Sequence, residues 1–190
     1  MRIIDTAALL SPDRLWTREE CLNKDSPVPR AAGVYAWYFR EIPPGVPVAD
    51  CRRAQGATLL YVGISPKRPP RNGSMPSRQT LRSRIRNHFL GNAAGSTLRL
   101  TLGCLLEQEL GLRLRRVGGG DRCTFGEGEQ QLSDWMEKNA LVTWLPVAEP
   151  WRLEEQLIAS LSLPLNLDQN RNHSFHDRLS ALRREARRRA

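Results

Sequence analysis

The sequence of 190 residues has little of what secreted, membrane-spanning or zinc-binding proteins need. Its four cysteines, Cys21, Cys51, Cys104 and Cys123, are widely spaced and include no Cys-x-x-Cys pair. This spacing argues against a structural zinc site and fits reduced thiols. No apolar run approaches the ~20 residues of a membrane-spanning helix, and the first ten residues are interrupted by Asp5 and too short for a signal peptide. We therefore expect a soluble, cytoplasmic protein.

Lysine is also scarce, although the chain is strongly basic. The formal net charge is +9, yet only Lys24, Lys67 and Lys138 are lysines, and the other basic residues are arginines. A basic excess favours a polyanionic partner, nucleic acid before a membrane surface, because Arg and Lys supply phosphate contacts. An arginine-rich composition can also reflect a coding bias, so the distribution of the charge matters more than its total.

Acidic residues are missing from the segment 65–86, where basic residues are concentrated. Its first half is rich in proline and glycine and indicates a loop. From about Thr80, a suitable N-cap, to Leu90 the pattern predicts a helix with one apolar side. A charged run is usually a solvated helix face, but one without compensating acids is better explained by phosphate contacts. The candidate nucleic-acid-binding residues are Lys67, Arg68, Arg71, Arg78, Arg82 and Arg86.

Two runs of aromatic and β-branched residues, 33–39 and 59–64, predict β-strands. Strand alternation places Tyr35, Trp37 and Phe39 on one face of the first strand. In the second strand, Leu59, Tyr61 and Gly63 share a face. If the strands pair antiparallel, Tyr35 and Tyr61 can lie side by side, and Gly63 leaves room for a close approach to the backbone. Taken alone, such a tyrosine pair more often belongs to the core.

The rest of the chain predicts one domain, 1–190, of the α/β (α+β) class. We expect a small, mainly antiparallel three-stranded sheet flanked by helices, with residues 140–145 as the third strand. Its core would span about 30–168, with additional helices at 12–24, begun by Ser11 and Pro12, and at about 175–189. Further helices are expected at 96–112, 129–138 and 150–162, and 40–58 should be a loop. The last helix ends in arginines that should add phosphate contacts, unless they form a solvated helix end.

Several short motifs follow one another in a telling order: GVY at 33–35, YVG at 61–63, Arg84, Glu154 with Leu-Ile at 157–158, and Asn166 after Pro164. In this order the set resembles the GIY-YIG nuclease family, over about residues 32–166. The long connection between the first two motifs departs from the shortest family members and is similar to restriction-enzyme members. The resemblance implies a GIY-YIG-like fold and a metal-dependent endonuclease.

The resemblance also implies roles for two charged residues. Glu154, rather than Glu155, would bind Mg²⁺ or Mn²⁺, because the family places Leu-Ile three and four residues after its Glu, and such ions accept carboxylate oxygens. The alternative is an acid favoured by the helix dipole. Arg84 would clamp the scissile phosphate, since the family spacing Leu-x-x-Arg-x-x-x-x-Phe is matched by Leu81 and Phe89, and a guanidinium can contact two phosphate oxygens.

Tyr35, Tyr61, His88 and Asn166 complete the candidate catalytic set. Tyr35 is expected to take a proton from water, but a free phenol with a pKa near 10 is a poor base. Arg84, the metal ion or His88 would therefore have to lower the pKa of Tyr35. His88 shares a helix face with Arg84 and would assist as a base, unless it is structural. Tyr61 would position water or a phosphate oxygen, and Asn166 would orient the site, unless it only closes a turn.

We therefore predict a divalent-metal-dependent endonuclease that hydrolyses DNA by single-step attack of water with one metal ion. No well-placed Ser, Cys or His nucleophile is evident, which excludes a covalent intermediate from the prediction. A nuclease for RNA or for branched or damaged DNA stays open, as does a binding module that does not cut. No membrane partner is expected, and double-strand cleavage would require a homodimer or two successive nicks.

Overall fold

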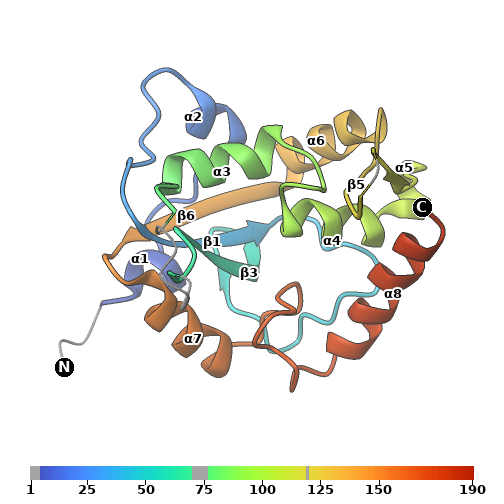
Figure 1. The fold of residues 1–190 in the computed structure, drawn as a ribbon. Helices are drawn as coiled ribbons and strands as arrows, with labels where there is room; N and C mark the ends of the chain where they lie inside the picture. Colours follow the sequence, from blue (N-terminus) through green and yellow to red (C-terminus); the bar gives the residue numbers. More distant parts are fainter. Residues whose placement is uncertain (1–4, 70–76, 119) are drawn as a thin grey trace.

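The computed structural model describes residues 5–69, 77–118 and 120–190 (Figure 1). Its centre is a four-stranded antiparallel sheet in the order β2-β3-β1-β6. The strands are β1 (Gly33–Phe39), β2 (Arg53–Ala54), β3 (Ala57–Ser65) and β6 (Ala140–Pro146). The predicted α/β class with an antiparallel sheet is confirmed. The sheet has four strands rather than three, because the short β2 pairs with the start of β3.

β1 lies in the middle of the sheet and is buried along its whole length. Such burial on both faces explains its run of aromatic and β-branched residues. Tyr35, Trp37 and Phe39 pack into one core cluster, whereas Val34, Ala36 and Tyr38 pack into another on the opposite face. The alternation predicted for this strand is therefore confirmed.

The alternation predicted for β3 is wrong at its first residue. A register shift between Trp37 and Tyr38 of β1 pairs Trp37 with Tyr61 and Tyr38 with Leu59, which leaves Leu60 opposite no residue. A β-bulge of this kind moves the residues on either side of it to new faces. Leu59 consequently packs in the cluster of Tyr38, and it is Leu60 that shares the cluster of Tyr61.

Helices cover both faces of the sheet (Figure 1). The helices α3 (Leu81–Leu90), α4 (Thr97–Leu105) and α6 (Gly128–Asn139) contribute to the cluster that contains Tyr35. Helices α1 (Ala7–Leu10) and α7 (Pro150–Ser160) contribute to the other cluster. The last helix, α8 (His176–Arg188), packs beside α4, close to the bounds predicted for it.

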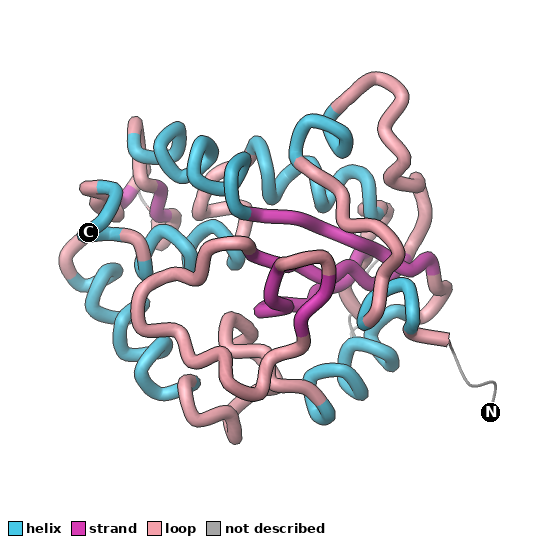
Figure 2. Tube along the Cα trace, turned by 180° about the vertical axis from the view of Figure 1, so that it is seen from behind, coloured by secondary structure: helices cyan, strands magenta, loops and turns pink. Residues whose placement is uncertain are grey.

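The connection between β1 and β2, residues 40–52, contains no helix or strand (Figure 2). The loop predicted for 40–58 ends sooner, because β2 and β3 form a tight hairpin. Its two turn residues, Gln55 and Gly56, have φ angles of 51° and 73°, as a two-residue hairpin of type I′ requires.

The N-terminal helix predicted for 12–24 is present only as α2 (Arg18–Leu22). Ser11 ends α1 instead of starting a helix. The residues before Thr17 stay extended because Trp16 exchanges two backbone hydrogen bonds of 2.9 Å with Val142 of β6. Thr17 then starts α2 through a capping box with Glu20.

The helix predicted for 96–112 is divided into α4 and the short α5 (Glu107–Leu110). It stops at Gly111, whose φ of 64° is left-handed. Next, β4 (Arg115–Arg116) and β5 (Cys123–Thr124) form a separate two-stranded sheet. All four cysteines are buried and free. Over the part of the chain that the structure describes, no helix is both long and apolar enough to cross a membrane.

Candidate active site

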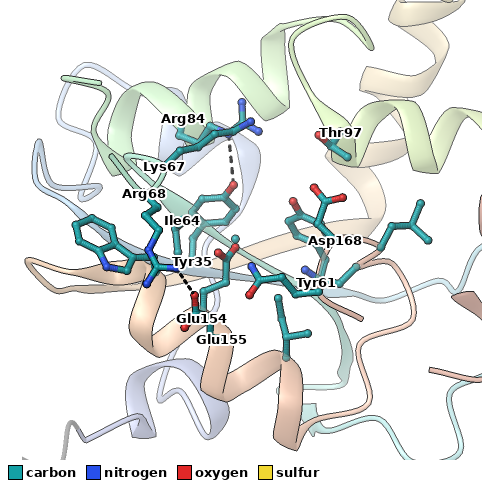
Figure 3. Close-up of a pocket in the computed structure, with 16 residues that line it drawn as sticks. Tyr35, Tyr61, Ile64, Lys67, Arg68, Arg84, Thr97, Glu154, Glu155 and Asp168 are labelled. Atoms are coloured by element: carbon teal, nitrogen blue, oxygen red, sulfur yellow. Dashed lines mark hydrogen bonds and ion pairs between the residues drawn. The ribbon is translucent and has the colours of Figure 1, made fainter. Parts of the chain in front are cut away.

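A cavity of about 540 Å³ lies where β1, β3, α3, α7 and the loop after α7 meet. Five of the six candidate catalytic residues line it, Tyr35, Tyr61, Arg84, Glu154 and Asn166. Figure 3 shows the side chains of Tyr35, Tyr61, Arg84 and Glu154 converging from separate elements. The sixth, His88, is fully buried behind Tyr35. Residues that are up to 131 positions apart in the sequence thus form one site.

Helix α3 places Arg84 and His88 against β1. Thr80 starts the helix, as predicted, through a capping box with Ser83. Its apolar side, which includes Ile85, is buried in the core, so the face that carries Arg84 and His88 is held toward Tyr35. Arg84 donates from Nε to the Tyr35 hydroxyl at 3.4 Å and from Nη1 to the Gly95 carbonyl at 3.0 Å.

A buried chain of polar groups continues from Tyr35 into the core. The Tyr35 hydroxyl lies 2.8 Å from Nε2 of His88, and Nδ1 of His88 lies 2.7 Å from Oγ of Ser96. Ser96 Oγ already accepts from the backbone N–H of Arg99 at 3.1 Å. Among the described residues its own hydrogen has only Nδ1 of His88 as acceptor. Because an unpaired buried hydroxyl is costly, Ser96 donates to Nδ1 and His88 donates from Nε2 to Tyr35.

The Gly63 of the second motif makes room for the tyrosine of the first. Gly63 is the partner of Tyr35 across the two strands. A Cβ atom at position 63 would lie 2.5 Å from the Tyr35 hydroxyl oxygen, which is too close for any side chain. The space that we predicted beside this glycine is therefore occupied by the Tyr35 ring.

The pKa of Tyr35 is raised, although Arg84 acts on it in the direction that we expected. Burial raises it, and the charge of Glu154 adds to this, while the guanidinium of Arg84 and its hydrogen bond oppose the shift. The pKa of Tyr61 lies well above its ordinary value, mainly through burial. Burial lowers the pKa of His88 well below its ordinary value, helped by Arg84 and Arg99. In the protein alone, both phenols and His88 are therefore neutral at pH 7.

Glu154 is the candidate metal-binding carboxylate of the site. Leu153 and Leu157 anchor α7 in the core under the sheet, which holds Glu154 toward Tyr35. Burial raises the pKa of Glu154 to about 7, and Asp168 and Glu155 add to the shift while Lys67 opposes it. Glu154 has no hydrogen bond or ion pair with another described residue. Its neighbour Glu155 is exposed and pairs with Arg68 at 3.0 Å.

This carboxylate fits a hard divalent cation. A half-buried carboxyl with a raised pKa and no protein partner is where a cation would add the most stabilisation, and Mg²⁺ prefers oxygen ligands. The described part of the chain has no group of three or more His, Cys, Asp or Glu residues that could enclose a metal ion. Glu154 would therefore hold the ion together with substrate oxygens and water.

Asn166 fastens the loop after α7 to β3. Its Oδ1 accepts from the Val62 N–H at 3.0 Å, and its Nδ2 donates to the Val62 carbonyl at 2.9 Å. Its backbone N–H also closes a turn onto Leu163. Its side chain is thus committed to the backbone next to Tyr61, and its role in orienting the site stays a prediction.

A comparison with protein families independently supports the order of these motifs. The family model described as the GIY-YIG catalytic domain matches residues 33–185. The chain belongs to the GIY-YIG family. Comparisons with curated proteins and with solved structures each found no match. The GIY-YIG domain is a nuclease domain, and all six candidate catalytic residues lie within the matched range.

The GIY-YIG pocket also contains residues that the sequence did not single out. Asp168 lies two positions after Asn166 and faces the pocket (Figure 3), so an acid beside the Pro-x-Asn motif was the available signal. Trp151 lines the same pocket after the proline that starts α7. Ser96 is the N-cap of α4, and nothing in the sequence connects it with His88.

The candidate phosphate-binding residues have different surroundings. Lys67 and Arg68 line the pocket, while Arg78 and Arg86 are exposed. Arg82 donates to the carbonyls of Ser26 and Val28 and so fastens α3 to the preceding segment. Because these bonds occupy its guanidinium, Arg82 is less suited to bind phosphate than the other residues of the set. Arg71 lies outside the described residues. These phosphate contacts stay predictions.

Proposed function

We propose that this GIY-YIG domain is a divalent-metal-dependent endonuclease that hydrolyses phosphodiester bonds of DNA in a single step. The observation that carries the proposal is the convergence of Tyr35, Arg84 and Glu154 on one cavity. It brings together a proton acceptor, a cation for phosphate and an unpartnered carboxylate, the three functions that phosphodiester hydrolysis needs.

Arg84 binds the scissile phosphate. Its Nε and Nη1 donate to Tyr35 and to Gly95, and Nη2 has no hydrogen bond with another described residue. The two bonds fix the plane of the guanidinium, so Nη2 is directed by contacts made before the substrate arrives. Such preorganised donors contribute to catalysis because they need no reorganisation in the transition state.

Tyr35 first loses its own proton to solvent, and the phenolate that forms then takes the proton of the attacking water. The phenolate oxygen accepts from Nε of Arg84 and Nε2 of His88. The water oxygen forms a bond to phosphorus, the bond to the leaving oxygen breaks, and the water proton passes to Tyr35. The hydroxyl of Tyr61 faces that of Tyr35 and opposes the rise in its pKa, and it would position water or a phosphate oxygen.

Glu154 would hold Mg²⁺ or Mn²⁺. When bound, such an ion supplies charge neutralisation at the phosphate and at the leaving oxygen. Its charge would also offset the effect of Glu154 on Tyr35, which raises the pKa of the phenol.

The test is incubation of the protein with supercoiled plasmid in Mg²⁺, in Mn²⁺ and in EDTA. We expect cleavage with either ion and none in EDTA. Glu154→Ala should abolish cleavage and leave DNA binding in EDTA intact, whereas the matched variant Glu155→Ala should be mild because Glu155 is exposed and its carboxylate is paired with Arg68. Loss of activity in Glu155→Ala with a fully active Glu154→Ala would reverse the assignment.

The same assay separates the rival substrates. One site cuts one strand per visit, so we expect nicked circles before linear plasmid, with double-strand cleavage through a homodimer or two nicks. Parallel reactions with single-stranded RNA and with branched DNA show whether another nucleic acid is cut faster. Tight DNA binding without cleavage of any of these substrates would favour a binding module.

A further inference from the structure

A second cavity, of about 670 Å³, adjoins the active-site cavity. The two share the residues Leu167, Asp168 and Gln169 of the loop after α7. The second cavity continues from this loop along α8 and is lined there by His176, Ser180, Arg183, Arg184 and Arg187, with Arg171 from the preceding loop. We call this cavity the arginine groove.

The charge of the arginine groove is almost entirely positive. Asp168 is the only carboxylate among its lining residues. Positions 180, 183, 184 and 187 follow helical spacing, so α8 presents them on one side. Within the described part of the chain, Arg171, Arg183 and Arg184 have no hydrogen bond or ion pair, and Arg187 only donates to the Asp121 carbonyl at 3.4 Å.

The remaining arginines at the end of α8 are neutralised within the protein. Arg188 pairs with Glu185 at 2.8 Å, and Arg189 pairs with Glu107 at 2.9 Å. One side of the helix thus carries paired charges, while the side along the groove carries unpaired ones. Composition alone does not explain this separation, because the same residue type occupies both sides.

Arg183 lines the arginine groove together with Asp168, which also lines the active-site cavity. It is half-buried, and burial lowers the pKa of its guanidinium; the charge of Arg187 adds to this, while Cys104 and Asp168 oppose the shift. A partly desolvated cation without an acceptor is unfavourable until an anion arrives. Arg183 therefore offers unsatisfied donors to an anion that enters the groove.

We propose that the arginine groove binds the backbone phosphates that flank the scissile phosphate on one side. This assignment rests on the proposed nucleic-acid substrate. A strand whose scissile phosphate contacts Arg84 would pass Asp168 and Gln169 and continue along α8, with its phosphates on Arg183, Arg184 and Arg187. The groove therefore sets the direction in which the substrate crosses the site.

The decisive experiment compares two double variants of the full chain that remove equal charge from neighbouring turns of α8. One is Arg184→Gln with Arg187→Gln, in the groove, and the control is Arg188→Gln with Arg189→Gln, outside it. Binding to a fluorescent duplex is measured in EDTA over a range of salt concentrations, so that the result does not depend on cleavage. Melting temperatures check that both variants fold.

We expect the groove variant to reduce the slope of log K against log salt by about 1.8, from about 0.9 per phosphate contact. Its affinity at 0.1 M salt should fall by tenfold or more. The control should keep the slope of the unsubstituted chain. Equal slopes in the two double variants would overturn the proposal, whether or not the protein cleaves DNA. If the groove variant has the reduced slope but the unsubstituted chain cleaves no substrate, the groove assignment would hold and the nuclease proposal would be wrong.

A free anion is the other source of the same chemistry. Inorganic phosphate is therefore titrated against the unsubstituted chain and the groove variant while melting is followed. A melting temperature that rises with millimolar phosphate only in the unsubstituted chain, together with an unchanged DNA slope, would assign the groove to a free anion and overturn the proposal.

Discussion

At the scale of single residues, Tyr35 is the most informative position. Its hydroxyl contacts Arg84 and His88, and its ring fills the space over Gly63. Tyr35→Phe keeps the ring and removes the oxygen. We expect turnover to fall by roughly 10² to 10⁴, the range of general-base catalysis, with a melting temperature lowered by only a few degrees.

Tyr61→Phe is the matched control for Tyr35→Phe. It also removes one phenol oxygen from the same cavity, but an oxygen that only positions water or phosphate and takes no proton, so the loss in turnover should be smaller. Melting temperatures measured beside the rates separate chemistry from packing. Unchanged turnover in both variants would mean that the two tyrosines serve only as core residues.

Ser96 carries a prediction that the sequence does not suggest. Ser96→Ala removes the hydroxyl that donates to Nδ1 of His88, so His88 no longer has a fixed hydrogen to donate to Tyr35. The phenolate of Tyr35 is then less stable, and the pKa of the phenol rises further. We expect the rising limb of the pH–rate profile to move to higher pH, with partial recovery of activity in alkali.

Ser96 also starts α4, so Ser96→Ala should lower the free energy of unfolding by about 1 kcal/mol. Ser96→Thr keeps both the hydroxyl and the cap, and should restore the position of the rising limb. A pH–rate profile that does not move in Ser96→Ala, while the melting temperature falls, would leave Ser96 with a capping role alone.

The sequence identifies a functional residue only where its role is marked by nearby positions in the chain. Arg84 and Glu154 were identified because each stands in a short pattern of fixed spacing. The choice of Glu154 over Glu155 agrees with their surroundings, since Glu155 is paired with Arg68. The link from Ser96 to His88 spans eight positions and a break between two helices, and it exists only after α3 and α4 pack. No sequence pattern indicated that Asp168 lies in the same cavity as Glu154.

At the scale of elements, the β1–β3 pair determines the geometry of the tyrosines. Gly63→Ala would place a Cβ atom 2.5 Å from the Tyr35 hydroxyl and so push the ring away from Arg84 and His88. Overpacking of this kind typically costs about 1 to 3 kcal/mol. We expect a lower melting temperature together with a loss of turnover of about a hundredfold or more, because the reacting oxygen is displaced.

Gly120→Ala is the control for Gly63→Ala. A Cβ atom at position 120 would meet no atom within 4 Å, so turnover and melting temperature should stay unchanged. Full activity in Gly63→Ala would show that the Tyr35 ring can move aside, and that its position over Gly63 is not required for the reaction.

The elements that the sequence predicted well are those whose buried face agrees with their local pattern. Helix α3 has its cap, Thr80, and its apolar side where the periodicity places them. The helix predicted for 12–24 was wrong because Trp16 pairs with Val142, a contact between distant segments that overrides Ser11 and Pro12 as a helix start. The bulge in β3 was missed for a similar reason, since only the pairing partner reveals an extra residue.

At the scale of the whole molecule, the net charge of +9 indicated a polyanionic partner without showing where it binds. The fold decides this, because it pairs Arg188 and Arg189 with acids and leaves Arg183 and Arg184 along the groove. It also commits Arg82 to backbone carbonyls, although the sequence grouped Arg82 with the phosphate-binding residues. Charge is additive along a chain, but its availability to a ligand depends on tertiary contacts.

The charge of Glu154 should also be visible in the stability of the protein without a metal ion. The fold raises the pKa of this carboxyl from 4.5 to about 7, so ionisation of Glu154 opposes folding. The favourable contribution of the neutral carboxyl is complete below pH 4.5 and is lost as the pH rises through about 7. Relative to Glu154→Gln, the unsubstituted protein should lose on the order of 2 kcal/mol of unfolding free energy between pH 5 and pH 8 in EDTA.

Urea unfolding of both proteins at several pH values measures this difference, and Glu155→Gln serves as the control, because Glu155 is exposed and should show no such loss. At pH 8, millimolar Mg²⁺ or Mn²⁺ should restore stability to the unsubstituted protein and not to Glu154→Gln, since an ion that binds only the folded state stabilises it by mass action. This readout requires no cleavage. An equal response of both proteins to the ion would place the metal away from Glu154, even if the nuclease activity itself is metal-dependent.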